Sequence, residues 1–425
     1  MNPTRRFCLP ALFVLMAATP CAADGRDELD ALANRPAVRA ALQHLVAMEQ
    51  ELLEDLVELT EIPAPPFGEG PRGERFAEML AEAGLTEIST DEAGNVIGRR
   101  PGRSGQRVIA LTAHLDTVFP PDTDVTVRID GNTYIAPGVG DNTRGLVVLL
   151  GILRALEQAA IGTEADVLFI GNTGEEGLGD LRGVKHLFRD GGPRIDAMIA
   201  VDGGRTERLV YGGVGSHRYR ITFKGPGGHS WGAFGTANPH HALGRAIEKF
   251  VTTAPGVNTE DEKTSFNIGR IGGGTSINSI PFESWLEVDM RSGSQDKLDE
   301  IDALFQAAVQ EALEEENAAR TEGDALTVSV ERVGQRPAAR GDRESGLVQG
   351  AAAAIAWAGL EPDYQLSSTD ANYPISIGIP AITLSRGGIS TDSHSPAESW
   401  ENVDSHLGLQ IVMLTLLGEA GIAAD

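Results

Sequence analysis

The stretch DVLFIGNTGEEGLGD, residues 166–180, places a short apolar run directly before two adjacent glutamates, Glu175 and Glu176. An apolar run of this length, bounded by glycine and polar residues, is typical of a buried strand. Two carboxylates side by side at its end repel each other, and a partly buried site raises the pKa of at least one of them. The pair is therefore either a solvated turn or part of a site that holds positive charge, and the rest of the sequence must decide.

Similar apolar runs recur along the chain. They lie at residues 108–112, 197–201 and 380–384. Segments with apolar residues at helical spacing precede or separate them, at residues 37–60, 72–83 and 145–156. Short apolar strands that alternate with helices favour an α/β fold with a mostly parallel central sheet flanked by helices.

The pattern changes near residue 214. Alternating polar and apolar residues indicate half-exposed strands at 217–224, 284–291 and 326–332, with helices at 242–253 and 295–315. We interpret the order as β-α-β-β-α-β, which is typical of a ferredoxin-like α+β domain. The sequence therefore predicts a catalytic domain in two parts, residues 24–213 and 335–425, with an inserted domain at residues 214–334.

Length and composition agree with two domains. The chain has 425 residues, of which 41% are apolar, so it can bury a sizeable core. Acidic residues outnumber basic ones by 61 to 35, and the resulting field repels nucleic acid and anionic membranes. Neither partner is expected.

Residues 1–23 have the pattern of a secretory signal peptide. Arg5 and Arg6 precede an apolar run, and small residues follow it. The run is too short to span a bilayer. The sequence thus predicts an exported protein, periplasmic or secreted. A twin-arginine signal and lipidation at Cys21 stay open as variants.

Cleavage near residue 23 would remove Cys8 and Cys21, the only cysteines of the chain. A mature protein without cysteine has no disulfides, so its stability comes from its core, a metal or assembly. Any metal would then be held by His, Asp and Glu.

Four further side chains lie close to predicted strand ends. His114 and Asp116, in ALTAHLDTV, are two residues apart and so point to the same side of a strand. Asp202 follows the strand at 197–201, and Asp141 lies in the glycine-rich loop GVGDNTRG before a helix. Open α/β sheets bind ligands at the carboxyl ends of their strands. A structural His–Asp pair, or a helix cap at Asp141, is the simpler alternative in each case.

His394, in GGISTDSHSPAESW, completes the set. Two histidines and three carboxylates, with one glutamate to spare, suit a pair of divalent metals, most of all zinc. Two zinc ions outweigh the charge of Asp141, Glu176 and Asp202, so the centre is cationic and acidifies a bound water. Glu175 can then take the proton of that water and deliver it to the leaving amine, as general base and then acid.

The order of these motifs resembles a known family, the co-catalytic zinc exopeptidases and deacylases. Its members include glutamate carboxypeptidase, peptidase T, succinyl-diaminopimelate desuccinylase and aminoacylase. The resemblance covers nearly all of the chain after the signal segment. The motifs that carry it are, in order, HLDTV, GxGDNxxG, GEEG, VDG, GPGGHS, NSIP, DMR and HSPxE.

The resemblance implies two zinc ions per chain; cobalt or manganese in place of zinc stays open. Asp141 would bridge both ions. His114 and Asp202 would complete the ligands of one ion, and Glu176 and His394 those of the other.

The resemblance also implies roles outside the ligand set. Asp116 would orient the neighbouring histidine, and the peptide bond after the bridging aspartate would be cis. The insertion would be a lid that forms a homodimer, and its His229 would reach into the partner subunit's site to polarise the carbonyl oxygen. Asn278 and Arg291 would grip a substrate carboxylate.

One segment departs from the family pattern. Family members usually have glycines before a Thr-Asp pair, whereas this chain has Ser367-Ser368-Thr369-Asp370. The difference concerns the substrate pocket rather than the metals.

The sequence predicts a dinuclear zinc hydrolase that cleaves amide bonds of short peptides, as an exopeptidase. GEEGLGDLRG favours the peptidase T and carboxypeptidase branch over the deacylases. Two alternatives stay open: an N-acyl-amino-acid deacylase or desuccinylase, which shares the whole metal site, and a catalytically silent peptide-binding homologue. The intact Glu175 argues against the latter, because a pure binder has no use for a proton shuttle.

Overall fold

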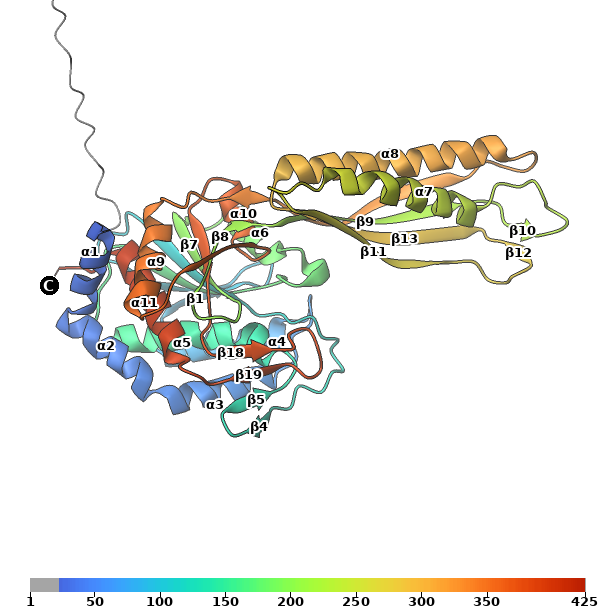
Figure 1. Cartoon of the computed structure of the whole chain (residues 1–425). Helices are drawn as coiled ribbons and strands as arrows, with labels where there is room; N and C mark the ends of the chain where they lie inside the picture. The colour runs from blue at the N-terminus through green and yellow to red at the C-terminus, as the bar shows by residue number, and fades with distance from the viewer. Residues whose placement is uncertain (1–22, 425) are drawn as a thin grey trace, which may run out of the picture.

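The computed structural model describes residues 23–424, so the predicted signal segment, residues 1–23, lies outside the described residues apart from its last position. The described chain forms a larger α/β body and a narrower arm that projects from it (Figure 1). Among residues 23–424, no helix combines the length and the apolar character needed to cross a membrane.

The body is built on a nine-stranded mixed sheet. In spatial order its strands are β1 (Glu87–Thr90), β2 (Val96–Arg100), β6 (Asp166–Asn172), β3 (Val108–His114), β7 (Ala197–Val201), β17 (Ala381–Leu384), β8 (Arg208–Gly213) and β15 (Ala339–Arg340), with β16 (Asp363–Ser367) paired to β8. The central strands β6, β3, β7 and β17 are parallel, whereas β2 pairs antiparallel with β6 and β8 with β17. The predicted α/β fold is confirmed. Pairing is parallel in the centre of the sheet, whereas the pairs β1–β2, β2–β6, β17–β8 and β8–β15 are antiparallel and β16 pairs parallel with β8.

Helices cover both faces of this sheet. They are α1 (Ala23–Ala33), α2 (Pro36–Ala47), α3 (Glu49–Thr60), α4 (Gly70–Glu82), α5 (Gly145–Gln158), α6 (Arg182–Leu187), α9 (Gly346–Trp357), α10 (Asn372–Ser376) and α11 (His406–Ala420). Ile109 and Leu111 of β3 point into the main core with α2, α5, α9 and α11, and Ala110 points into a smaller cluster with Leu187 of α6. Burial on both faces explains why these strands read as continuous apolar runs.

The helix predicted over residues 37–60 is two helices in the structure. The chain leaves helical geometry at Met48, whose φ is −87° and ψ is 10°, and α3 starts at the next residue. Leu45, Met48 and Leu52 are all buried. The apolar stripe thus continues through the bend, and for that reason the sequence pattern gave no sign of it.

The arm is a four-stranded antiparallel sheet with two helices on one face (Figure 1). Its strands, in spatial order, are β11 (Thr264–Gly273), β13 (Glu283–Ser292), β9 (Gly215–Lys224) and β14 (Thr327–Arg336), and its helices are α7 (Pro239–Thr253) and α8 (Gln295–Ala319). The chain order is β-α-β-β-α-β, in agreement with the ferredoxin-like prediction, although the second strand, β11, is not among the three strands whose residues were predicted. Alternate residues such as Ile221 and Leu286 face the helices, and the other face of the sheet is open.

Two smaller sheets complete the fold. One joins β4 (Arg128–Asp130) and β5 (Thr133–Ile135) to β18 (Ile389–Thr391) and β19 (Ser399–Glu401), so segments from both halves of the body meet. The other is the hairpin-like pair β10 (Gly228–His229) and β12 (Ser279–Ile280) at the far tip of the arm (Figure 1).

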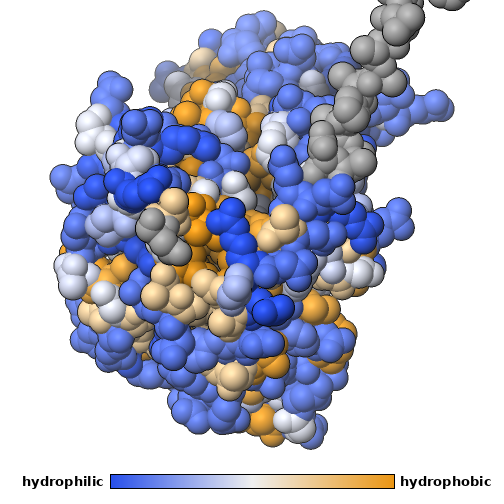
Figure 2. All heavy atoms as spheres, turned by 90° about the vertical axis from the view of Figure 1, so that its left-hand side faces the viewer, coloured by the Kyte–Doolittle hydropathy of each residue, from blue (hydrophilic) through white to orange (hydrophobic). Residues whose placement is uncertain are grey.

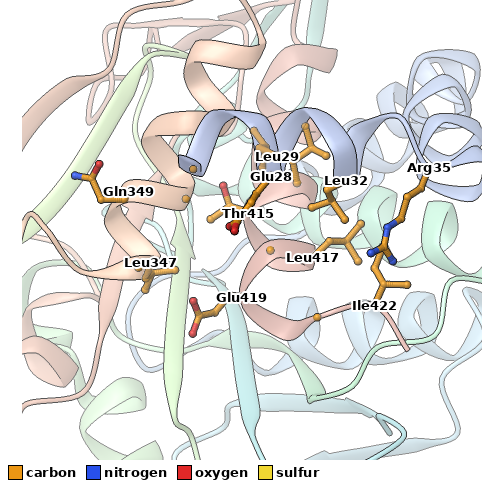
Figure 3. Close-up of a pocket in the computed structure, with 16 residues that line it drawn as sticks. Glu28, Leu29, Leu32, Arg35, Leu347, Gln349, Thr415, Leu417, Glu419 and Ile422 are labelled. Atoms are coloured by element: carbon orange, nitrogen blue, oxygen red, sulfur yellow. The ribbon is translucent and has the colours of Figure 1, made fainter. Parts of the chain in front are cut away.

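A cavity of about 460 Å³, lined by both apolar and polar side chains, lies between α1, α9 and α11 (Figure 3). Leu29, Leu32 and Leu417 line it together with Glu28 and Arg35. Figure 2 shows apolar side chains gathered on this face of the body. No histidine is among the lining residues, and the groups able to hold a metal lie elsewhere.

Candidate metal centre

Three neighbouring strands bring predicted site residues to one edge of the large sheet. His114 is the last residue of β3, Asp202 follows β7 directly, and Glu175 and Glu176 follow β6. Because β6, β3 and β7 are adjacent and parallel, their carboxyl ends lie side by side. The structure therefore gathers these four residues at the edge where open α/β folds bind ligands.

Five side chains form two triads that share Asp141. Ligand atoms of His114, Asp141 and Asp202 lie within 4.8 Å of one another, and so do those of Asp141, Glu176 and His394. His114 Nε2 is 3.4 Å from Asp141 Oδ1, whereas His394 Nε2 is 3.2 Å from Asp141 Oδ2 and 2.8 Å from Glu176 Oε1. The two oxygens of Asp141 thus face different triads, as a bridging carboxylate requires.

The donor atoms of both triads fit a divalent metal. Two ligand atoms of a tetrahedral zinc site, each about 2.1 Å from the ion, lie about 3.4 Å apart. The histidine-to-aspartate separations in the two triads are close to this value. Imidazole and carboxylate donors without thiolate also accept manganese or cobalt.

The carboxylate of Asp116, in the HLDTV motif, forms hydrogen bonds with the backbone of the GEEG motif. Its Oδ1 accepts the backbone N–H of Glu175 at 3.0 Å and its Oδ2 that of Glu176 at 2.8 Å. His114 Nδ1 lies 3.0 Å from the Asp116 carbonyl oxygen and 3.6 Å from its carboxylate. The predicted orienting of His114 thus falls mainly to the carbonyl, and the carboxylate fixes the backbone of the two glutamates. Burial opposes ionisation of Asp116, but His114 and these N–H groups outweigh it and lower its pKa.

The loop that carries Asp141 is held by a residue to which the sequence analysis gave no role. Glu398, fully buried, accepts the N–H groups of Gly138 at 3.1 Å, Gly140 at 3.0 Å and Asp141 at 2.7 Å. The Asp141–Asn142 peptide bond is cis, as the resemblance implies. Glu398 lies in the quoted motif HSPxE, and its spacing from His394 was the available signal.

Replacing Glu398 with alanine is expected to destabilise the metal-free protein by about 3 kcal/mol, because three N–H donors lose their acceptor. Urea unfolding after chelator treatment measures this loss. Glu398→Gln, which keeps one acceptor oxygen, should lose less, and Glu344→Ala, at an exposed glutamate, should lose nothing. An alanine variant as stable as the wild type would contradict the role.

Glu175 is paired with a buried arginine from the arm. Arg336, the last residue of β14, donates to Glu175 Oε1 at 2.7 Å, and also to the Glu175 carbonyl and to Ser368 Oγ. Among residues 23–424, no side chain forms a hydrogen bond or ion pair with Glu175 Oε2. Burial raises the pKa of Glu175 well above its ordinary value, with Glu176 adding to the rise and Arg336 opposing it.

His394 reaches the cluster from a loop between β18 and β19. Its φ is 66°, and its side chain is 52% exposed. Hydrogen bonds to Asp141 and Glu176 raise its pKa to about 10 without a metal. A divalent ion bound by these two carboxylates would have this imidazole as its third ligand.

The cluster opens into a cavity of about 330 Å³ whose lining includes three arginines, Arg218, Arg291 and Arg336. Asp289 holds two of them through their Nε atoms: Arg218 at 2.8 Å and Arg291 at 2.7 Å. Arg218 also donates to the carbonyl of Gly177 at 2.9 Å. The predicted carboxylate-binding Arg291 is thus beside the metal triads, and Arg218, which the sequence analysis missed, lies on the neighbouring strand.

His229 and Asn278 do not join this cluster within one chain. They are neighbours at the tip of the arm, where Ser230 N donates to the Asn278 carbonyl at 2.9 Å (Figure 1). Both side chains are exposed. Their roles in a partner subunit's site stay predictions.

The segment that departs from the family pattern borders the site, because Ser368 is one of the residues that line the cavity. Ser368 accepts a hydrogen bond from Arg336, and Asp370 accepts one from Asn172 at 2.8 Å. Burial raises the pKa of Asp370 to about 6. The serine in place of a glycine therefore supports the arginine that contacts Glu175.

Comparison with known proteins gives one family. The sequence profile of the peptidase family M20/M25/M40 matches residues 110–417. YqjE, an uncharacterized protein of Bacillus subtilis, is 25% identical over 80% of this chain and 91% of its own length. Carboxypeptidase G2 of a Pseudomonas species is 24% identical over 58% of this chain and 60% of its own. Succinyl-diaminopimelate desuccinylase of Xanthomonas oryzae is 30% identical over 44% and 54%.

Solved structures show the same fold. Aminopeptidase PepT of Bacillus cereus matches with a TM-score of 0.69 at 21% identity, over 87% of this chain and 98% of that one. A match at this identity concerns the arrangement of elements, which includes both the body and the arm.

Proposed function

Because the chain belongs to the peptidase family M20/M25/M40, we propose that it is a dinuclear metallohydrolase that cleaves amide bonds of short peptides. The observation that carries the proposal is the pair of triads that share Asp141, with Glu175 beside them. Zinc is the proposed metal, with cobalt or manganese as replacements.

Two divalent ions, when bound by the two triads, would supply Lewis acidity toward the scissile carbonyl and a water molecule. Glu175 would accept a proton from the attacking water and return it to the leaving amine, as general base and then acid. Its raised pKa favours both steps, because burial makes the carboxylate a stronger base and stabilises the protonated form that donates to the amine. Arg336 anchors Oε1, which leaves Oε2 as the oxygen that carries the proton.

The charges of the cavity support a substrate with a free carboxylate. Arg218 and Arg291 lie side by side on β9 and β13, held by one aspartate. Every acidic residue among the lining residues is already a proposed ligand or Glu175 itself. No acidic residue of this lining is left to bind the ammonium group of a substrate. The site therefore favours carboxypeptidase or deacylase activity over aminopeptidase activity.

The proposed test combines metal content with a matched substrate panel. We expect about two zinc ions per chain and hydrolysis of a dipeptide that is lost when its carboxylate is amidated. Hydrolysis of N-acetyl or N-succinyl amino acids without dipeptide cleavage would instead establish a deacylase. Stoichiometric binding without turnover in the zinc-loaded protein would establish a silent peptide-binding homologue.

We also propose export and a homodimer. Export rests on the sequence of residues 1–23. The homodimer rests on His229 and Asn278, which resemble substrate-contacting residues but lie at the tip of the arm. The site would then be completed by the tip of a second copy.

A further inference from the structure

A buried arginine outside all of the motifs contacts the shared Asp141 and, beyond it, a second carboxylate of only one triad. Arg386 follows β17, and its side chain is 2% exposed. Its Nη1 donates to Asp202 Oδ1 at 3.0 Å and to Asp141 Oδ1 at 3.3 Å. Across residues 23–424 it makes no hydrogen bond or ion pair to Glu176 or His394. Apart from the shared Asp141, the guanidinium therefore contacts a metal-ligand candidate only in the His114–Asp141–Asp202 triad, and its other hydrogen bonds go to Asn142 Oδ1 and Ser390 Oγ.

The two carboxylate oxygens of Asp141 also differ in their contact with Arg386. Arg386 donates to Oδ1, the oxygen that faces His114, whereas Oδ2 faces His394. A divalent ion in the first triad and the guanidinium would therefore share both carboxylates. They carry like charges, and a guanidinium is a permanent cation. Repulsion between them is strengthened in a buried site, where water screens poorly.

Arg386 also acts when no metal is bound. Asp141 and Asp202 are then two carboxylates in one confined place, and a buried charge without a partner is strongly destabilising. The guanidinium neutralises part of that charge. The binding free energy of a metal ion at this triad is therefore less favourable, because the guanidinium already neutralises part of the charge of the two carboxylates.

We propose that Arg386 is a built-in counter-ion of the His114–Asp141–Asp202 triad, which stabilises the empty triad and lowers its affinity for a divalent cation. This inference rests on the proposed dinuclear site. A purely orienting residue would have the opposite effect, because loss of an outer partner of a metal ligand typically weakens metal binding by about 10–100-fold. The sign of the change therefore separates the two roles.

The experiment measures zinc affinity, by competition with a chromophoric chelator, in proteins that keep one triad. His394→Ala keeps the triad that Arg386 contacts, and His114→Ala keeps the other. Arg386→Met is expected to tighten zinc binding roughly tenfold or more in the first background and to change it little in the second. Arg386→Lys retains the charge and should stay close to the arginine parent in both.

Thermal unfolding gives a second readout. Arg386→Met should lower the Tm of the chelator-treated protein more than that of the zinc-loaded protein. If the methionine variant does not fold, Arg386→Gln takes its place in both measurements. Weaker zinc binding on removal of the charge, or an equal change in both backgrounds, would overturn the inference while leaving the dinuclear site intact. Parent proteins that bind no zinc would overturn both.

Discussion

Glu175→Gln is expected to abolish turnover while the metal content stays that of the wild type. Glu175 groups with His114 and Glu176 but belongs to neither triad around Asp141, so the ligands of both triads remain. Glutamine keeps the size of the side chain and an oxygen to which Arg336 can donate, but it takes up no proton. The loss of a general base lowers kcat by about 10²–10⁴-fold. Turnover of the preferred substrate and metal content per chain are the two quantities to measure.

The neighbouring glutamate supplies the matched control. Glu176→Gln makes the same chemical change one residue later, at a member of the Asp141–Glu176–His394 triad, and should lower the metal content instead. Wild-type kcat/KM should rise as the pH rises through the pKa of Glu175, because the base acts only when deprotonated. This rise of kcat/KM with pH should be absent in Glu175→Gln. A Glu175→Gln protein that retains full turnover, or loses metal, would refute the division of roles.

The sequence predicted the members of the metal cluster because strand ends leave a readable pattern. His114, Asp202 and the Glu175–Glu176 pair each follow an apolar run, and parallel strands bring their ends together. No pairing information was needed for that step. The antiparallel edges of the sheet, by contrast, depend on which strands meet, and short runs such as β1 and β15 carry no sign of it.

The arginines could not be predicted in the same way. Arg336 ends a half-exposed strand of the arm, and Arg386 follows a strand in a glycine-containing loop; both positions are ordinary for a surface charge. Each becomes significant only because tertiary packing buries it against a carboxylate. Arg218 differs: it lies cross-strand from Asp289 in register, so knowledge of the β9–β13 pairing would have placed it beside Arg291.

Asp141→Ala is expected to remove both metals together and to reduce turnover to background. Both triads use this residue, each through a different oxygen. Loss of an outer partner of a ligand already weakens metal binding by about 10–100-fold, so loss of a shared ligand should weaken it further at both positions. Metal content after gel filtration and turnover at saturating substrate test this.

Two controls make the result specific to a bridging role. Asp202→Ala removes a ligand of one triad and should release one metal while the other stays bound. Asp324→Ala, at an exposed aspartate of the arm, should change neither metal content nor turnover. If Asp141→Ala released one ion and kept the other, Asp141 would serve a single subsite, and the two triads would then be alternative positions for one metal rather than a pair.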